Sequence, residues 1–382
     1  MDKIKLIDTT LRDGEQAPGV VFLLKEKLAI CELLDKAGIP EVEVGTPAIG
    51  KREVRDIQAI TQAGYKFKTL SWCRGIKSDI EAAQKSGTNG VHISFPVSEI
   101  HLAALDKTKS WALDSMRELV AFASDKFEYV TIGAQDASRC EIDFLDEFIE
   151  LAESLGVHRV RIADTVGILN PFSTFQLFRK LRSHHANIGL EFHGHNDLGM
   201  ATANTITAIK AGADFASITV NGIGERAGNA ALEEVIMALK ISEKAELNIQ
   251  TQYLSQLSQL VSRASGKPIN DFKPVTGDMV LKHESGIHTK SMLKNRETYQ
   301  IINASDIGRE EHEFVFGKHS GKASVKAFFL KNKIVISDQQ CQLILNIIKE
   351  RSHILKRSIS IGEILIIHDE LEKRLTMSPN SL

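Results

Sequence analysis

One repeating pattern constrains the fold of this chain more than any other feature. A short apolar segment, a polar loop and an amphipathic helical segment follow one another through the first two thirds of the sequence, and several of the helical segments end at a glycine. Strands that alternate with helices in this way pair in parallel. The predicted strands lie at residues 4–11, 41–45, 66–73, 90–95, 128–134, 158–164, 188–195 and 214–221.

Helical patterns separate these strands and support the same interpretation. They cover residues 25–36, 54–62, 111–124, 144–154, 172–184 and 202–210, and the glycines that follow helical segments are Gly38, Gly64, Gly87, Gly156 and Gly212. Such glycines can take the left-handed conformation that ends a helix. Eight units in about 240 residues predict an α/β fold of the (β/α)8 TIM-barrel type, with a doubly wound open sheet as the alternative.

The strand-and-helix pattern ends near residue 260, which predicts that a linker and a separate C-terminal region follow the barrel. We expect residues 1–260 to form a TIM-barrel catalytic domain and residues 261–277, which contain Pro268 and Pro274, to form a linker. Residues 278–382 then form a small, mostly helical C-terminal region. The chain of 382 residues is long enough for one large domain and this appendage.

Composition narrows the class of partner. A formal net charge of −2 gives no basic patch for nucleic acid or an anionic membrane. The four cysteines lie far apart, and no run of about 18 apolar residues or signal-peptide segment is present. These features predict a cytoplasmic protein that acts on small molecules.

Two histidines at the end of the seventh predicted strand are the leading metal ligands. Side chains two apart in a strand project to the same side, so His193 and His195 point together. In a barrel the active site lies at the carboxyl ends of the strands, where Asp13 and Asn229 also fall. Two imidazoles and a carboxylate suit a divalent cation and leave positions open for substrate. Surface or structural histidines are the alternative.

Charged side chains accompany this group. Arg12 precedes Asp13 and could stabilise an oxyanion beside the metal, or it could form a local ion pair that caps the loop. Glu43 places a carboxylate inside an otherwise apolar strand and could pair with Arg12. Gly222, Gly224 and Gly228 lack the dinucleotide-binding spacing and indicate only close backbone approach to a ligand or to the metal shell.

Beyond the barrel, three potential proton carriers fall within one short segment. They are His283, His288 and Tyr299. Their spacing alone does not distinguish a catalytic role from a structural one. Proton transfer would require this segment to fold over a barrel mouth.

The motifs together resemble those of the 2-isopropylmalate synthase and homocitrate synthase family over essentially the whole chain. They are residues 8–16 (DTTLRDGEQ), 193–197 (HGHND), 221–229 (NGIGERAGN) and 317–321 (GKHSG). Residues 17–20, 71–74, 136–139 and 163–167 most resemble the homocitrate synthases that serve nitrogenase cofactor assembly.

This resemblance implies a Claisen condensation of acetyl-CoA with 2-oxoglutarate that gives homocitrate and CoA. It implies a divalent metal ion (Mn, Mg or Zn) held by Asp13, His193 and His195, with Asn229 near or in the shell. It further implies that Arg12 and Glu43 act at the reacting centre, that Thr165 binds the oxo acid's carboxylate, and that C-terminal subdomains are exchanged in a homodimer. Tyr299 and a histidine, His288 in preference to His283, would then complete the partner's site.

One departure from the family pattern bears on the substrate. Lysine-pathway homocitrate synthases resemble one another in an Arg-x-Ser near the end of the fifth strand, whereas this chain has Thr131, Ile132 and Gly133 there. Either Arg74 or His92 takes the distal carboxylate of 2-oxoglutarate, or the substrate is 2-oxoisovalerate or pyruvate. A lyase that runs the reverse cleavage and a non-catalytic metal-binding protein are the more distant alternatives.

Overall fold

The structure is a computed structural model that describes residues 4–310 and 313–377. The chain divides into two compact units between Ile269 and Asn270. Helix α10 (Leu254–Ser265) is the last helix of the first unit.

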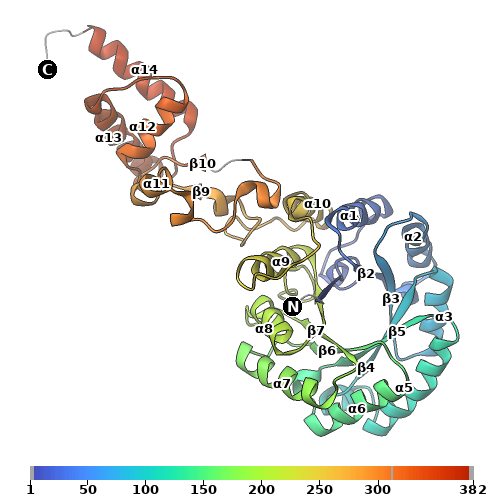
Figure 1. Cartoon of the computed structure of the whole chain (residues 1–382). Helices are drawn as coiled ribbons and strands as arrows, with labels where there is room; N and C mark the ends of the chain where they lie inside the picture. Colours follow the sequence, from blue (N-terminus) through green and yellow to red (C-terminus); the bar gives the residue numbers. More distant parts are fainter. Residues whose placement is uncertain (1–3, 311–312, 378–382) are drawn as a thin grey trace. The chain divides into compact units, whose positions relative to one another are not determined.

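The first unit is a closed barrel of eight parallel strands in sequential order, surrounded by helices (Figure 1). Pairing of the last strand with the first closes the barrel and excludes the open-sheet alternative, so the predicted fold is confirmed. The strands are β1 (Lys5–Asp8), β2 (Glu41–Gly45), β3 (Lys68–Arg74), β4 (Gly90–Pro96), β5 (Tyr129–Gln135), β6 (Arg159–Asp164), β7 (Gly189–Gly194) and β8 (Phe215–Ile218).

The surrounding helices lie close to the predicted ranges, with α3, α4, α9 and α10 in addition. They are α1 (Leu24–Ala37), α2 (Lys51–Gln62), α3 (Lys77–Ser86), α4 (Glu99–Ala104), α5 (Lys109–Ser124), α6 (Ile142–Ser154), α7 (Pro171–His184), α8 (Ala201–Ala211) and α9 (Leu232–Ile241). Local chemistry sets their ends. Asn170 accepts from the Ser173 backbone N–H ahead of Pro171 at the start of α7. Gly38 ends α1 at φ 80°, and a Cβ there would lie 2.9 Å from the Asn248 carbonyl oxygen.

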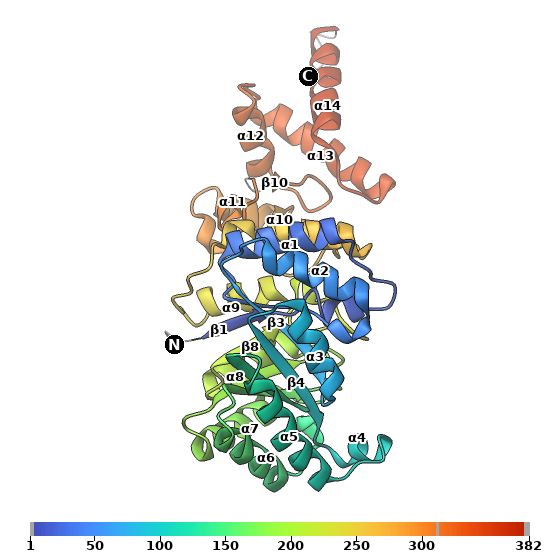
Figure 2. The same ribbon diagram turned by 90° about the vertical axis from the view of Figure 1, so that its right-hand side faces the viewer.

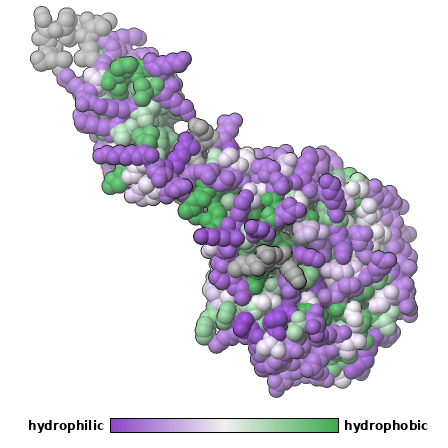
Figure 3. Space-filling view, in the orientation of Figure 1, coloured by the Kyte–Doolittle hydropathy of each residue, from purple (hydrophilic) through white to green (hydrophobic). Residues whose placement is uncertain are grey.

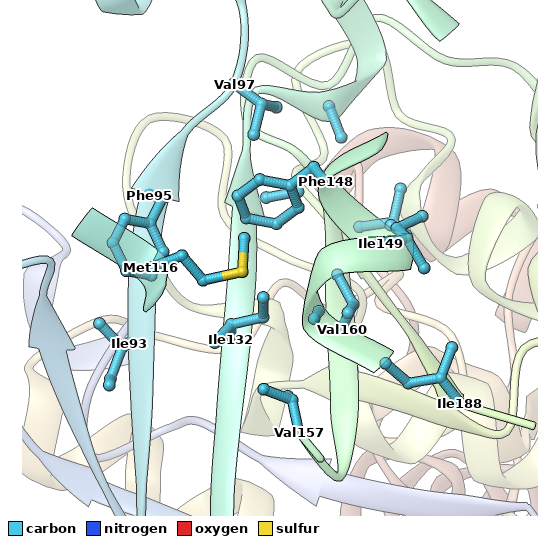
Figure 4. Packing of buried hydrophobic residues seen from close by; sticks show 14 of the residues in the cluster. Ile93, Phe95, Val97, Met116, Ile132, Phe148, Ile149, Val157, Val160 and Ile188 are labelled. Carbon is cyan, nitrogen blue, oxygen red and sulfur yellow. The ribbon is translucent and has the colours of Figure 1, made fainter. Parts of the chain in front are cut away.

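Apolar side chains fill the layer between the strands and the helices (Figure 4). Along β4, Val91, Ile93 and Phe95 enter this layer, and Phe95 meets Phe148 of α6 edge to face with ring centroids 6.2 Å apart. Burial of each such side chain contributes about 1.5–3 kcal/mol. Because strand side chains alternate, the intervening residues face the inside of the barrel.

The second unit is mostly helical, as predicted. It contains α11 (Gly286–Met292), α12 (Lys322–Lys331), α13 (Asp338–Leu355) and α14 (Ile361–Met377) (Figure 2). It also contains the short parallel pair β9 (Lys282–His283) and β10 (Glu313–Phe314), labelled in Figure 1. A separate apolar cluster that includes Phe316, Phe329 and Ile348 packs the last three helices together.

No helix among the described residues combines the length and the apolar character needed to cross a bilayer. Hydrophilic residues predominate on the face of the barrel unit drawn in Figure 3. All four cysteines are free thiols.

Candidate active site

A cavity of about 250 Å³ lies at the carboxyl ends of the barrel strands. This is the face where barrel enzymes carry their chemistry. Six of the predicted site residues line it: Arg12, Asp13, His92, Thr165, His193 and His195. The repeat of strands and helices therefore brings together side chains that are up to 183 positions apart in the chain, counted from Arg12 to His195.

Asp13, His193 and His195 offer one ligand atom each around a common point. The Asp13 Oδ2 atom lies 3.1 Å from His193 Nε2 and 4.0 Å from His195 Nε2, and the two nitrogens are 3.3 Å apart. All three side chains are buried, and both Nδ1 atoms of the histidines lack a hydrogen-bond partner. A buried carboxylate facing two imidazole nitrogens is the donor set of a divalent metal ion.

The protonation of these residues suits ligation. Burial and the neighbouring His193 lower the pKa of His195 to about 4, so its imidazole is neutral at neutral pH. Burial alone would raise the pKa of Asp13, but Arg12 and the two histidines outweigh it and hold that pKa well below its usual value. A neutral imidazole and an ionised carboxylate are the forms that bind metal.

Asn229 adjoins this group in a loop whose backbone is tightly folded. Its Nδ2 donates to Asp13 Oδ1 at 3.3 Å and to the Ile223 carbonyl oxygen at 3.2 Å, while its own Oδ1 is buried without a partner. A Cβ at Gly224 would lie 2.2 Å from Asn229 Nδ2, and one at Gly228 would lie 1.9 Å from the Gly222 carbonyl oxygen. The glycines therefore permit the close approach that holds Asn229 against Asp13.

Arg12 is a buried cation fixed beside Asp13. Its Nη1 donates to Asp13 Oδ2 at 3.0 Å and its Nε donates to Glu43 Oε2 at 2.7 Å. Its guanidinium also lies 5.6 Å from the centre of the Trp72 ring. Burial would raise the pKa of Glu43, but Arg12 and Arg161 lower it to about 2, so both groups of the pair are charged.

Sequence reasoning missed the remaining charged residues of the barrel interior. Arg161 of β6 lines the cavity and donates to Glu43 Oε1 at 3.0 Å, and it also pairs with Glu191 of β7. Arg159 pairs with the other oxygen of Glu191 and with Glu41 of β2. Charges at alternate positions of a predicted strand, in EVEV at 41–44 and RVRI at 159–162, were the signal that could have found them.

His92 and Thr165 occupy the wall of the cavity. His92 Nδ1 lies 2.9 Å from Thr131 Oγ1, and burial with the nearby Arg161 lowers the pKa of His92 well below its usual value. Thr165 Oγ1 accepts from the Asp136 backbone N–H at 2.9 Å. A neutral imidazole and a hydroxyl thus face the substrate space together with Ser94.

The structure does not bring Arg74 to this cavity. Its side chain is 58% exposed, and its guanidinium donates to both oxygens of Asp79 at 2.8 and 3.0 Å. It lines a different groove, between α2 and α3. The last residue of a strand need not point into the barrel, which the sequence alone did not reveal.

The predicted proton carriers beyond the barrel all lie in the second unit. The rings of His288 and Tyr299 are stacked with centroids 4.0 Å apart, and Tyr299 is 45% exposed. His283 belongs to β9, and its carbonyl oxygen accepts from the Val315 backbone N–H at 3.0 Å. Two of the three predicted proton carriers, His288 and Tyr299, are therefore in direct contact within the second unit.

Comparison with known families matches both parts of the chain. A family described as HMGL-like matches residues 3–261. A second, described as Homocitrate synthase post-HMGL domain-like, matches residues 275–356. The two matches cover the barrel and much of the second unit.

Similar proteins cover nearly the whole chain. 2-isopropylmalate synthase 2 of Caldanaerobacter subterraneus subsp. tengcongensis is 41% identical over 369 residues, covering 96% of each chain. Homocitrate synthase 1 of Nostoc sp. is 43% identical over 367 residues, covering 96% of this chain and 97% of its own. Among solved structures, the HMG-CoA lyase of Bacillus subtilis superimposes with a TM-score of 0.64 at 19% identity, covering 70% of this chain and 96% of that one, which supports the fold.

Proposed function

Because this chain belongs to the HMGL-like family, we propose that it is a metal-dependent acyltransferase that condenses acetyl-CoA with a 2-oxo acid. The two relatives described above are named as synthases and match this chain over nearly their whole length. The reverse cleavage by a lyase is disfavoured because the homocitrate synthase post-HMGL match covers residues 275–356, much of the second unit.

One observation carries the proposal: Asp13, His193 and His195 converge beside the buried guanidinium of Arg12. A divalent cation (Mn, Mg or Zn) bound there would polarise the keto group of a 2-oxo acid and orient its carboxylate. Asn229 would stand next to the cation, since its Nδ2 contacts Asp13. Only part of the cation's surroundings is filled by these side chains, which leaves room for substrate.

Arg12 and Glu43 would act at the reacting carbon. Condensation turns the keto oxygen into an alkoxide, and Arg12 is a buried, fixed cation at the wall of the cavity. Glu43 keeps Arg12 in place through the 2.7 Å bond to Nε. The hydroxyl of Thr165, at the cavity wall, would bind the carboxylate of the oxo acid.

The base is proposed to come from the second unit of another copy of the chain. His288, stacked on Tyr299, would take a proton from the acetyl methyl group as the new carbon–carbon bond forms, with His283 as the alternative. Water then hydrolyses the thioester and releases CoA. This arrangement implies a homodimer with exchanged C-terminal units.

We propose 2-oxoglutarate as the oxo acid and homocitrate as the product. The cavity wall presents His92, Ser94, Gln135 and Arg161, polar groups that suit a substrate with a second carboxylate. His92 thus takes over part of the role that Arg-x-Ser has in the lysine-pathway enzymes. A place in nitrogenase cofactor assembly, in the cytoplasm, is the corresponding physiological prediction.

2-Isopropylmalate or citramalate synthesis is the alternative, with 2-oxoisovalerate or pyruvate as substrate. Trp72, Ala163 and Gly133 supply apolar surface in the same cavity. The similarity to a 2-isopropylmalate synthase at 41% identity favours the same alternative.

The deciding assay follows thiol release from acetyl-CoA in the presence of added divalent metal. Four acids should be compared: 2-oxoglutarate, 2-oxoisovalerate, pyruvate and glyoxylate. The highest kcat/KM with 2-oxoglutarate is the expected result. Preference for 2-oxoisovalerate or pyruvate would transfer the proposal to the alternative, and no turnover with any of the four would refute the synthase proposal.

A further inference from the structure

A continuous series of alternating charges crosses the inside of the barrel. We call it the charge ladder; its members, in order from the cavity inwards, are Arg12, Glu43, Arg161, Glu191, Arg159 and Glu41. Each member is ion-paired with the next. It begins beside the metal ligand Asp13 and ends at Glu41 and Arg159, the first residues of β2 and β6.

Each carboxylate in the middle of the ladder accepts hydrogen bonds from two arginines, one on each oxygen. Glu43 accepts from Arg12 on Oε2 at 2.7 Å and from Arg161 on Oε1 at 3.0 Å. Glu191 accepts from Arg161 on Oε1 and from Arg159 on Oε2, each at 2.5 Å. Arg161 therefore connects the two carboxylates. Glu191 is linked to Arg12 through two intermediate side chains, those of Arg161 and Glu43.

The ladder is buried and electrically balanced. No side chain in its five ion pairs is more than 6% exposed. Its three arginines and three glutamates sum to zero formal charge, so the charge of Asp13, next to Arg12, stands outside this balance. Arg159 also donates to the Tyr129 hydroxyl, and the Ser217 hydroxyl donates to Glu191.

Stability alone is a poor reason for such an arrangement. The inside of a (β/α)8 barrel is ordinarily packed with branched apolar residues. Removing charges from water costs several kcal/mol per ion, and apolar replacements of a whole buried network are often neutral or stabilising. Geometry at the reacting centre is a better reason, because catalysis tolerates little displacement of a group that stabilises developing charge.

We propose that the charge ladder positions Arg12 for catalysis, with Arg161 and Glu191 as positioning residues. Arg161 faces the cavity, while Glu191 acts entirely through its neighbours. The proposal rests on the proposed function for its kinetic consequence. Its structural consequence, energetic coupling between Arg12 and a residue that it does not touch, is independent of any substrate.

Glu191→Gln is the primary test because glutamine preserves the shape of the side chain. We expect kcat to fall about tenfold while KM for the oxo acid changes less than about twofold, since an interaction made in the transition state is weakened. Arg161→Met should lower kcat further, and Arg161→Lys should restore part of it because lysine can satisfy one carboxylate but not both. If Arg161→Met does not fold, Glu191→Gln decides.

Arg182→Met provides the matched control. Arg182 also holds several partners, which are the carboxylate of Asp214 and carbonyl oxygens that include those of Gly212 and Ile188, and none of these residues is a member of the ladder. It should lower the melting temperature and leave kcat within about twofold of the unmodified protein. Equal kcat values for Glu191→Gln and the unmodified protein would overturn the proposal.

A double-mutant cycle on unfolding separates this proposal from the proposed function. Arg12→Gln and Glu191→Gln are measured singly and together by urea denaturation. We expect the effects on the unfolding equilibrium constant to depart from multiplicativity by about fivefold or more. Multiplicative effects would overturn the ladder proposal. Lack of turnover by the unmodified protein would refute the synthase assignment and leave the cycle as the test of coupling.

Discussion

Asp8 should make the barrel less stable as the pH rises from 5 to 8. It is fully buried at the end of β1 and accepts from the Thr10 backbone N–H at 3.0 Å and from Thr10 Oγ1 at 2.7 Å. Burial, with smaller contributions from the carboxylates of Glu233 and Glu43, raises its pKa from 3.8 to about 7. Folded Asp8 therefore keeps its proton at a pH where the unfolded chain has lost it.

The sign and size of the effect follow from this difference. The stabilising contribution is complete below the unfolded pKa of 3.8 and is lost as the pH rises through about 7. At about 1.4 kcal/mol per pH unit, the full loss is on the order of 4 kcal/mol. About 3 kcal/mol of it falls between pH 5 and pH 8.

Urea unfolding of the unmodified protein and of Asp8→Asn at several pH values isolates this contribution. Both tryptophans, Trp72 and Trp111, belong to the barrel unit, so their fluorescence follows its unfolding. The free energy of unfolding of the unmodified protein, minus that of the variant, should fall by about 3 kcal/mol from pH 5 to pH 8. A flat difference, or one that rises with pH, would refute the reasoning, because Asp8 would then be ionised in the folded protein.

Three further predictions concern the site. His195→Ala should lose both bound metal and turnover, and full turnover without metal would contradict the ligand assignment; metal content and thiol release measure the two losses. Mixing His288→Ala and Arg12→Ala chains should restore activity in mixed dimers if each site uses two chains, and verified mixed dimers without activity would exclude exchange. Gly228→Ala should destabilise the barrel by about 2 kcal/mol or more beyond the effect of Gly156→Ala. A Cβ at residue 228 would lie 1.9 Å from a carbonyl oxygen, whereas a Cβ at residue 156 would meet nothing within 4 Å. The two glycines have similar φ values of 85° and 74°, so the backbone strain of the two substitutions is comparable. Equal unfolding midpoints for the two glycine variants would remove the close-contact explanation.

Periodicity was enough to predict the barrel and the convergence of Asp13, His193 and His195. Strand β7 is apolar on its other side, at Leu190 and Phe192, so the shared direction of His193 and the following His195 was predictable from alternation. Asp13 followed because strand ends of a barrel meet at one face. Helix α3 was predicted only through Gly87, which ends it, and its bounds were not predicted because it buries only a narrow stripe that includes Ile80 and Ala83.

The pairing of Glu43 with Arg12 was predicted, but the other pairings between distant side chains of the barrel interior were not. Arg161 is adjacent to Glu191 through the register of β6 and β7, which a single sequence does not specify. Arg74 ends a strand like several cavity residues but turns to Asp79, five positions along the chain. A nearby carboxylate such as Asp79 can bind an arginine that would otherwise point into the cavity, and the spacing of residues in the sequence does not show which of the two the arginine contacts.

The closed balance of the charge ladder restricts how this barrel can evolve. Loss of one partner, such as Arg159 alone, leaves a buried carboxylate without its counter-charge and lowers the free energy of unfolding by about 3–5 kcal/mol. Replacement of a whole charged set by apolar residues can be tolerated. Substitutions in the barrel interior should therefore occur together in sets that keep the charges balanced, and a single substitution of one ladder residue should be selected against. Descendant sequences are expected to carry Glu41 and Arg159 together or to have replaced both, because that pair is neutral and its loss leaves the other four members balanced.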